Sequence, residues 1–191
     1  MRIGKTRNES SSGGWNDLVS AGLGMPTKGA KAPAYEVIMG RLQLPCYSAS
    51  TENESWSSAH FLHDYKELSE VFPHVHWTHN QVGDESGVVR WGFESWWARG
   101  HRGEQFVKLP DFFLEQQAGA SLTHNIIESA DGMELIGLEP DSIVLFTIYR
   151  DATHANDTFT GKAAMIGVDT HYESDECLTQ EKKAPFRKTG Y

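Results

Sequence analysis

The segment FPHVHWTHN, residues 72–80, places three histidines within six residues and carries the strongest suggestion of chemistry in the sequence. Imidazole is a common metal ligand, and side chains two residues apart on an extended chain point to the same side, as His74 and His76 would. His171 lies on the polar face of another predicted strand. These three histidines, His74, His76 and His171, therefore form a candidate mononuclear metal site.

A cupin-type enzyme would hold its metal with an HxH pair, a glutamate a few residues later, and a histidine on a later strand. Here the nearest acidic residue after His76 is Asp84, beyond His79 and inside a predicted turn, so the carboxylate spacing is not met. Alternatively, HxH pairs from several subunits could surround one iron or zinc ion on a symmetry axis. We favour a third interpretation, in which the histidines form a polar strand face that is solvated or faces a neighbouring subunit.

Other patterns that could carry chemistry are incomplete. The sequence has no GxSxG elbow for a serine nucleophile. The loop with Asp151, Asn156 and Asp157 could bind Ca²⁺, but it lacks the spacing and glycine of an EF-hand. We expect the Asp157 side chain to accept hydrogen bonds from backbone N–H groups of its turn instead. Cys46 and Cys177 lie far apart without a CxxC motif, so we expect neither a zinc knuckle nor a disulfide framework.

The tryptophans offer a further hypothesis, because indole rings can stack against sugars. The candidates are Trp77, Trp91, Trp96 and Trp97. Large aromatic side chains at alternating strand positions more often belong to a core or a subunit interface, and we favour that interpretation.

Charge and hydropathy exclude several classes of partner. The net charge is −9, which disfavours binding to the phosphate backbone of nucleic acid, since that requires clustered Lys and Arg. The first residues are basic but lead into no apolar segment, and no apolar run reaches the roughly 18 residues of a membrane span. We therefore expect neither nucleic acid nor a membrane as a partner, and we expect no secretion signal.

Hydrophobic periodicity predicts an all-β protein. Residues 71–79 alternate, with Val75 and Trp77 facing the core, and residues 88–97 alternate in the same way, which together predict an antiparallel hairpin. Residues 143–150 are apolar on both faces and predict a central strand. The last strand is expected at residues 162–174, and a short helix at residues 59–72. Strands without a β–α–β rhythm predict an antiparallel, jelly-roll-like β-sandwich.

The ends of the chain differ from its middle. We predict an extended N-terminal arm at residues 1–33 and the β-sandwich domain at residues 34–176. A basic C-terminal tail is expected at residues 177–191. Polar arms of this kind do not bury enough apolar surface to order alone, so we expect them to lie across neighbouring subunits.

A series of motifs resembles a known family. WNDL from Trp15, FPHVHW from Phe72, GVVRWGFESWW from Gly87, and the stretch from Ile143 with RD, DTF and DTHY are similar to small structural proteins of tailed bacteriophages. The family pattern is PHVHW, then RD, then DTF or DTY, then DxHY. The resemblance spans most of the chain, although Gly92 and Ser95 replace larger residues.

The resemblance implies a non-enzymatic virion protein without a cofactor, assembled in the host cytoplasm. We expect a capsid decoration protein or a neck, tail or fibre-attachment subunit, which forms a homo-oligomer such as a trimer and contacts capsid, portal or tail proteins. The expected interface residues are Trp15, Leu18, His74, His76 and Trp96. The alternative function is a cupin-like metal-dependent enzyme that uses His74, His76 and His171.

Overall fold

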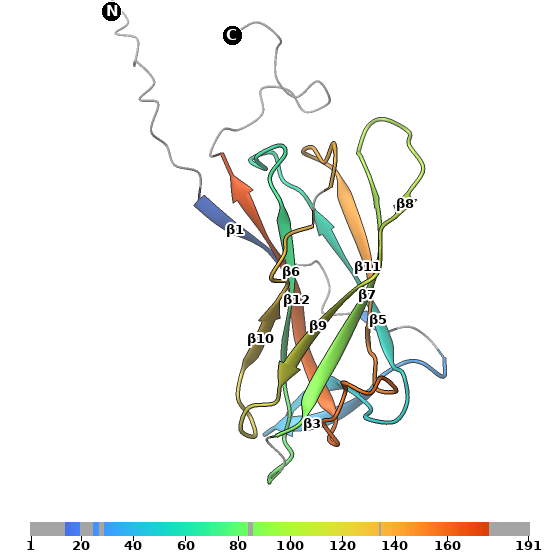
Figure 1. Cartoon of the computed structure of the whole chain (residues 1–191), viewed down its shortest axis with the longest axis vertical. Coiled ribbons are helices and arrows are strands. Elements are labelled where there is room, and N and C mark those ends of the chain that lie inside the picture. Colours follow the sequence, from blue (N-terminus) through green and yellow to red (C-terminus); the bar gives the residue numbers. More distant parts are fainter. Residues whose placement is uncertain (1–13, 20–24, 27–28, 84–85, 134, 176–191) are drawn as a thin grey trace, which may run out of the picture.

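Two antiparallel β-sheets pack face to face (Figure 1). The computed structural model describes residues 14–19, 25–26, 29–83, 86–133 and 135–175, and none of these residues is helical. The predicted antiparallel β-sandwich is therefore confirmed. Within the same ranges, no segment could cross a membrane as a helix.

Among the described residues, each sheet contains six strands. Sheet A has the order β10 (Asn125–Glu128), β6 (Val71–Thr78), β12 (Ala163–Ser174), β4 (Leu42–Tyr47) and β3 (Ala34–Met39), with β1 (Gly14–Val19) also paired to β12. Sheet B has the order β2 (Met25–Pro26), β5 (Glu54–His60), β11 (Ile143–Arg150), β7 (Val88–Ala98) and β8 (Val107–Lys108), with β9 (Phe112–Gln117) also paired to β7. From β4 onward most consecutive strands lie in opposite sheets, as in a jelly-roll-like sandwich.

The predicted hairpin of residues 71–79 and 88–97 is wrong. Both segments are strands, but β6 belongs to sheet A and β7 to sheet B. Their apolar faces meet across the core, where the Trp77 and Trp91 rings lie with centroids 6.5 Å apart. Alternation shows that a strand has an apolar face, but it does not show whether the next strand pairs with it or packs opposite to it.

The helix predicted over residues 59–72 is also wrong. β5 continues to His60, and a loop then leads to β6. Phe61 and Tyr65 have the spacing of a helix, yet both turn into the core from this loop, with their rings 5.2 Å apart. The Tyr65 hydroxyl closes the loop by donating to the backbone oxygen of Ser69 at 2.6 Å.

The strand predicted at residues 143–150 is confirmed as β11, which lies at the centre of sheet B between β5 and β7. Gly92 of β7 lies opposite Tyr149 of β11. A Cβ atom at residue 92 would come within 2.4 Å of the Tyr149 ring, so any larger residue here would require this ring to move.

The described part of the predicted N-terminal arm belongs to the sandwich itself. β1 pairs with β12 along its whole length, and β2 pairs with β5. Leu18, a predicted interface residue, is buried in the hydrophobic core of its own chain and has little surface for a partner. Residues 1–13 and the predicted tail 177–191 lie outside the described residues.

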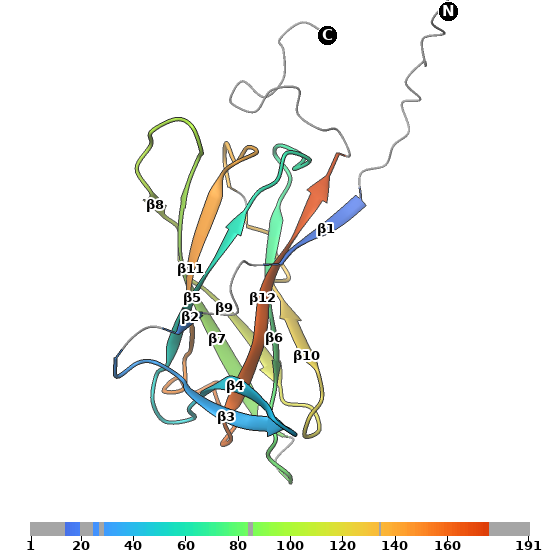
Figure 2. The same ribbon diagram turned by 180° about the vertical axis from the view of Figure 1, so that it is seen from behind.

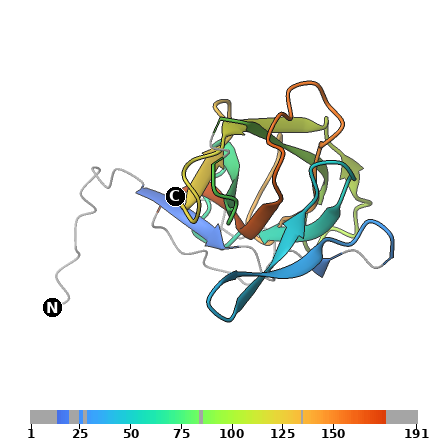
Figure 3. The same cartoon turned by 90° about the horizontal axis from the view of Figure 1, so that it is seen from below.

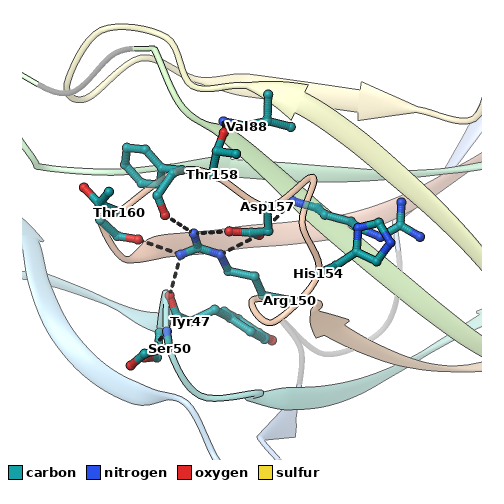
Figure 4. Close-up of polar contacts among 12 residues, drawn as sticks. Tyr47, Ser50, Val88, Arg150, His154, Asp157, Thr158 and Thr160 are labelled. Carbon is teal, nitrogen blue, oxygen red and sulfur yellow. Dashed lines mark hydrogen bonds and ion pairs between the residues drawn. The ribbon is translucent and has the colours of Figure 1, made fainter.

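A buried ion pair joins the two sheets at one end of the sandwich (Figure 4). The side chains of Arg150, at the end of β11, and Asp157 are 0% and 1% exposed. Arg150 Nε and Nη2 donate to the two Asp157 carboxylate oxygens at 2.9 and 2.7 Å. Nη1 donates to the backbone oxygens of Tyr47 (3.3 Å) and Gly161 (2.6 Å), and Nη2 also donates to that of Phe159. All five guanidinium N–H groups therefore have an acceptor.

The Asp157 carboxylate also accepts a hydrogen bond from the backbone N–H of Arg90 at 3.0 Å. The Asp157 side chain thus accepts a hydrogen bond from a backbone N–H group, as expected from the sequence, but not from its own turn. The partner, however, lies on β7, far away in sequence, and the main partner is the arginine.

We predict that Asp157→Ala lowers the free energy of unfolding by about 3–5 kcal/mol, because it leaves the Arg150 charge buried without a counter-ion. The matched control is Asp111→Ala, which removes an exposed partner 3.4 Å from Lys108 Nζ and should cost at most about 1 kcal/mol. Urea unfolding of both variants measures the difference. Equal losses in the two variants would contradict this role of the ion pair.

Candidate functional site

The candidate site lies on sheet A, where β10, β6, β12 and β1 run side by side (Figure 2). Along β6, Val75 faces the core, so His74 and His76 on either side of it face outward. Along β12, Asp169 and His171 face outward in the same way. The register of β6 and β12 places Asp169 directly beside His74.

His74 is almost completely buried although it lies on this outer face. Its side chain is 3% exposed because neighbouring side chains cover it: the His171 ring stacks on it at 4.3 Å and the His76 ring lies 4.9 Å away. Its Nδ1 lies 3.4 Å from the backbone oxygen of Phe72. The expected orientation of the histidines is therefore correct, but the expectation of a solvated or partner-facing stripe is wrong for His74.

His76 is held between a second histidine and a carboxylate. Its Nδ1 lies 2.8 Å from His124 Nε2, and the two rings stack at 5.1 Å. Its Nε2 lies 3.2 Å from Asp169 Oδ2 but is buried without a hydrogen bond, because the geometry is unfavourable. Burial lowers the pKa of His76, and the Asp169 charge opposes this shift only in part. The ring is therefore kept neutral near pH 7, the form that binds metals.

His171 on β12 contacts carboxylates on β1, which pairs with β12, and on β10, which lies beyond β6. Its Nε2 lies 2.6 Å from Asp17 Oδ1 on β1, and its Nδ1 contacts the Glu128 carboxylate on β10. These contacts hold the described part of the N-terminal segment on sheet A.

The structure thus brings the three predicted metal ligands together, in two overlapping groups. One group consists of His74, His76 and Asp169, and the other of Asp17, His74 and His171; within each, the potential ligand atoms lie within 4.8 Å of one another. The sequence analysis missed Asp169 and Asp17. Asp169 could have been found, because it stands two residues before His171 and shares its face of the strand.

A shallow pocket of about 370 Å³ lies beside this cluster and is lined by Trp15, Phe72, Glu128 and His171. Trp15 packs edge-on against the Phe72 ring at 5.4 Å but remains 58% exposed. Trp96, another predicted interface residue, lies on β7 of the other sheet and is also exposed. Of the five predicted interface residues, Trp15 and Trp96 are thus the two with large exposed surfaces.

A second histidine cluster surrounds Asp141 at the end of the sandwich. His101 donates to Asp141 Oδ2 at 2.9 Å, and His63 and His60 lie 3.2 and 3.4 Å from Oδ1. Burial alone would raise the pKa of the Asp141 carboxyl, but the hydrogen bond from His101 and the charge and hydrogen bond of His63 together lower it. This cluster ties three loops together through one carboxylate.

The hypothesis of a Ca²⁺ site at residues 151–157 is not supported by the geometry. Asp157 binds Arg150, Asp151 accepts from Arg90 Nε at 3.0 Å, and the Asn156 amide donates to Glu115. The two carboxylates therefore accept hydrogen bonds from arginines, and Asn156 turns its amide N–H group to Glu115.

The sugar-stacking hypothesis is wrong for two of its four tryptophans, since Trp77 and Trp91 are completely buried in the core. Cys46 is buried as well, and burial raises the pKa of its thiol to about 11. A thiol of that pKa is a weak nucleophile at neutral pH.

Comparisons with known proteins show no family to which this chain belongs. No protein-family model and no curated protein matches the sequence. One similar solved structure is that of TmCBM61 in complex with β-1,4-galactotriose, with a TM-score of 0.33 and 13% sequence identity over 84% of this chain and 88% of that chain. A similarity this low carries no argument about what this chain binds.

We predict that the stabilising effect of Asp141 disappears in acid. A carboxyl whose pKa is lower in the folded than in the unfolded state stabilises the fold above its unfolded pKa of about 3.9, and this contribution is lost as the pH falls through the folded pKa. Asp141→Asn should therefore be less stable than the wild type at about pH 5, and the difference should shrink as the pH falls below about 3.9. Asparagine is the suitable replacement because it tolerates the φ of 62° at this position.

Urea unfolding at the two pH values measures the effect, with Asp131→Asn, an exposed position, as the control. A difference between wild type and Asp141→Asn that stays constant from about pH 5 to about pH 3 would show that the histidine contacts do not stabilise the charged carboxylate.

Proposed function

We propose that this chain is a non-enzymatic structural subunit of a tailed-bacteriophage virion and acts by protein–protein assembly. In this proposal it associates with copies of itself and with capsid, portal, neck or tail proteins. The phage-like motif series supports the proposal from the sequence. The structural observation that supports it is the exposed apolar surface of the hairpin formed by β3 and β4.

This hairpin extends beyond the body of the sandwich (Figure 3). Four large apolar side chains on it are 39–50% exposed: Tyr35, Val37, Met39 and Leu42. A group of exposed apolar side chains on one element is typical of an interaction surface.

The backbone of β3 supports the same proposal. β3 is the last strand of sheet A and pairs only with β4 in the part of the chain that the structure describes. An exposed edge strand can add a strand from another chain, and proteins that do not use such an edge usually protect it with charges or prolines. Glu36, paired with Lys162, is the one charged side chain on β3. We propose that the occupant of this edge is a second copy of the chain.

The second candidate function is the cupin-like metal-dependent enzyme. The observation that favours it is the approach of His74, His76 and His171 on one face of sheet A, next to a pocket. Such an enzyme would require its metal to stay accessible to substrate, whereas His74 is almost completely covered. We therefore rank it below the structural role.

We predict that Val37→Glu converts the oligomer into the monomer, because a charge in the apolar hairpin opposes its burial against a partner. The matched control is Val82→Glu, the same change at a position that is 87% exposed in a loop. Light scattering coupled to size-exclusion chromatography measures the mass of the wild type and both variants, and thermal melting confirms that the variants are folded.

A wild type that is monomeric at all accessible concentrations, or an oligomer that survives Val37→Glu, would overturn the proposed use of this edge. The virion role is tested by the copy number of the chain in purified virions, measured by mass spectrometry relative to the portal. Roughly a dozen copies or fewer would indicate the neck or tail, hundreds would indicate the capsid, and absence from virions would exclude the role.

A further inference from the structure

The outer face of sheet A holds two imidazole nitrogens against one carboxylate oxygen, and an assembly role does not require this arrangement. We propose that His74, His76 and Asp169 bind one divalent transition-metal ion of the zinc class. The site differs from the histidine triad predicted from the sequence, because its third ligand is a carboxylate and not His171.

The ligand atoms are identified by their distances. His76 Nε2 and His74 Nε2 lie 3.2 and 4.0 Å from the same atom, Asp169 Oδ2. Ligands of a tetrahedral zinc ion, each about 2.0–2.2 Å from the metal, lie roughly 3.4 Å from one another. Both nitrogen–oxygen distances differ from this value by less than an ångström.

The other nitrogen of each histidine already has the partner that a metal ligand needs. His74 Nδ1 faces the backbone oxygen of Phe72, and His76 Nδ1 faces His124. Histidines that bind metal through Nε2 commonly use Nδ1 in this way, which fixes the orientation of the ring. Both rings are thus held with Nε2 on the side of Asp169.

One polar atom at this position is left unsatisfied by the protein alone. His76 Nε2 is buried without a hydrogen bond beside a carboxylate oxygen. The His74 side chain is 3% exposed, and its Nδ1 lies 3.4 Å from the backbone oxygen of Phe72 and 3.7 Å from Glu128 Oε2. Buried polar atoms without partners are rare because each loses its hydration. A cation between the two nitrogens and the carboxylate would satisfy all three atoms at once.

The donor set selects the class of metal. Two imidazole nitrogens and one carboxylate oxygen suit zinc and its neighbours in the first transition row, whereas Ca²⁺ and Mg²⁺ prefer oxygen donors alone. The His76 and Asp169 side chains are 18% and 19% exposed, so an ion can enter from the outer face of the sheet. Water can take the fourth position there.

The test is titration of the chelator-treated full chain with ZnCl₂ by calorimetry, together with elemental analysis of the bound metal and the visible spectrum of the Co²⁺ form. We expect one ion per chain. His76→Gln and Asp169→Asn should each weaken binding by about 100-fold or more, beyond the 10–100-fold typical of an outer partner. Melting of the metal-free variants establishes that each is folded.

Two matched controls make the result specific. His154→Gln lies in an exposed loop and should keep the wild-type affinity. His171→Gln removes a ring stacked on His74 but no proposed ligand, so it should weaken binding less than His76→Gln does. Absence of saturable binding, or a loss of binding in His171→Gln but not in His76→Gln, would overturn the site. Because the readout is metal bound per chain, its outcome is independent of whether the protein assembles through β3.

Discussion

The buried guanidinium of Arg150 is the constraint on which the rest of the fold depends. A charge taken out of water costs several kcal/mol unless its donors are all matched, so the acceptors around it must stay at fixed positions. Those acceptors come from the end of β4, through Tyr47, and from the connection between β11 and β12, through Asp157, Phe159 and Gly161. Because β11 lies in sheet B and β4 in sheet A, satisfying one side chain holds the two sheets together at this end.

The same constraint extends to the histidine cluster through β12. This strand begins at Ala163, two residues after Gly161, and its register with β6 shifts between Met165 and Gly167. The shift places Asp169 beside His74 and sends both side chains to the outer face. A slip of one residue would turn Asp169 into the core, so the proposed metal site exists only in the register that the bulge allows.

Sheet A therefore carries two separate features. The cluster of His74, His76 and Asp169 lies on β6 and β12, in the interior of the sheet, where neighbouring side chains cover it. The apolar hairpin lies at the edge, on β3 and β4, where no further strand covers it in the described part of the chain. Residues in the interior of a sheet can be held rigidly enough to bind an ion, and an edge strand has free backbone groups to offer a partner. The two proposals concern different strands and can succeed or fail separately.

The sequence by itself determined the fold class, the central position of residues 143–150, and the sides of the strand on which Val75 and His74 lie. These follow from alternation and from runs that are apolar on both faces, which are local properties of the chain. The tertiary structure alone decided that β6 and β7 face each other across the core, that Leu18 is buried, and that Asp157 pairs with Arg150. It also decided that Asp169 joins His74 and His76, while His171 turns to Asp17. Each of these outcomes depends on which strand lies beside which, and in an antiparallel sandwich that order is set by packing between segments far apart in sequence, which no local pattern records.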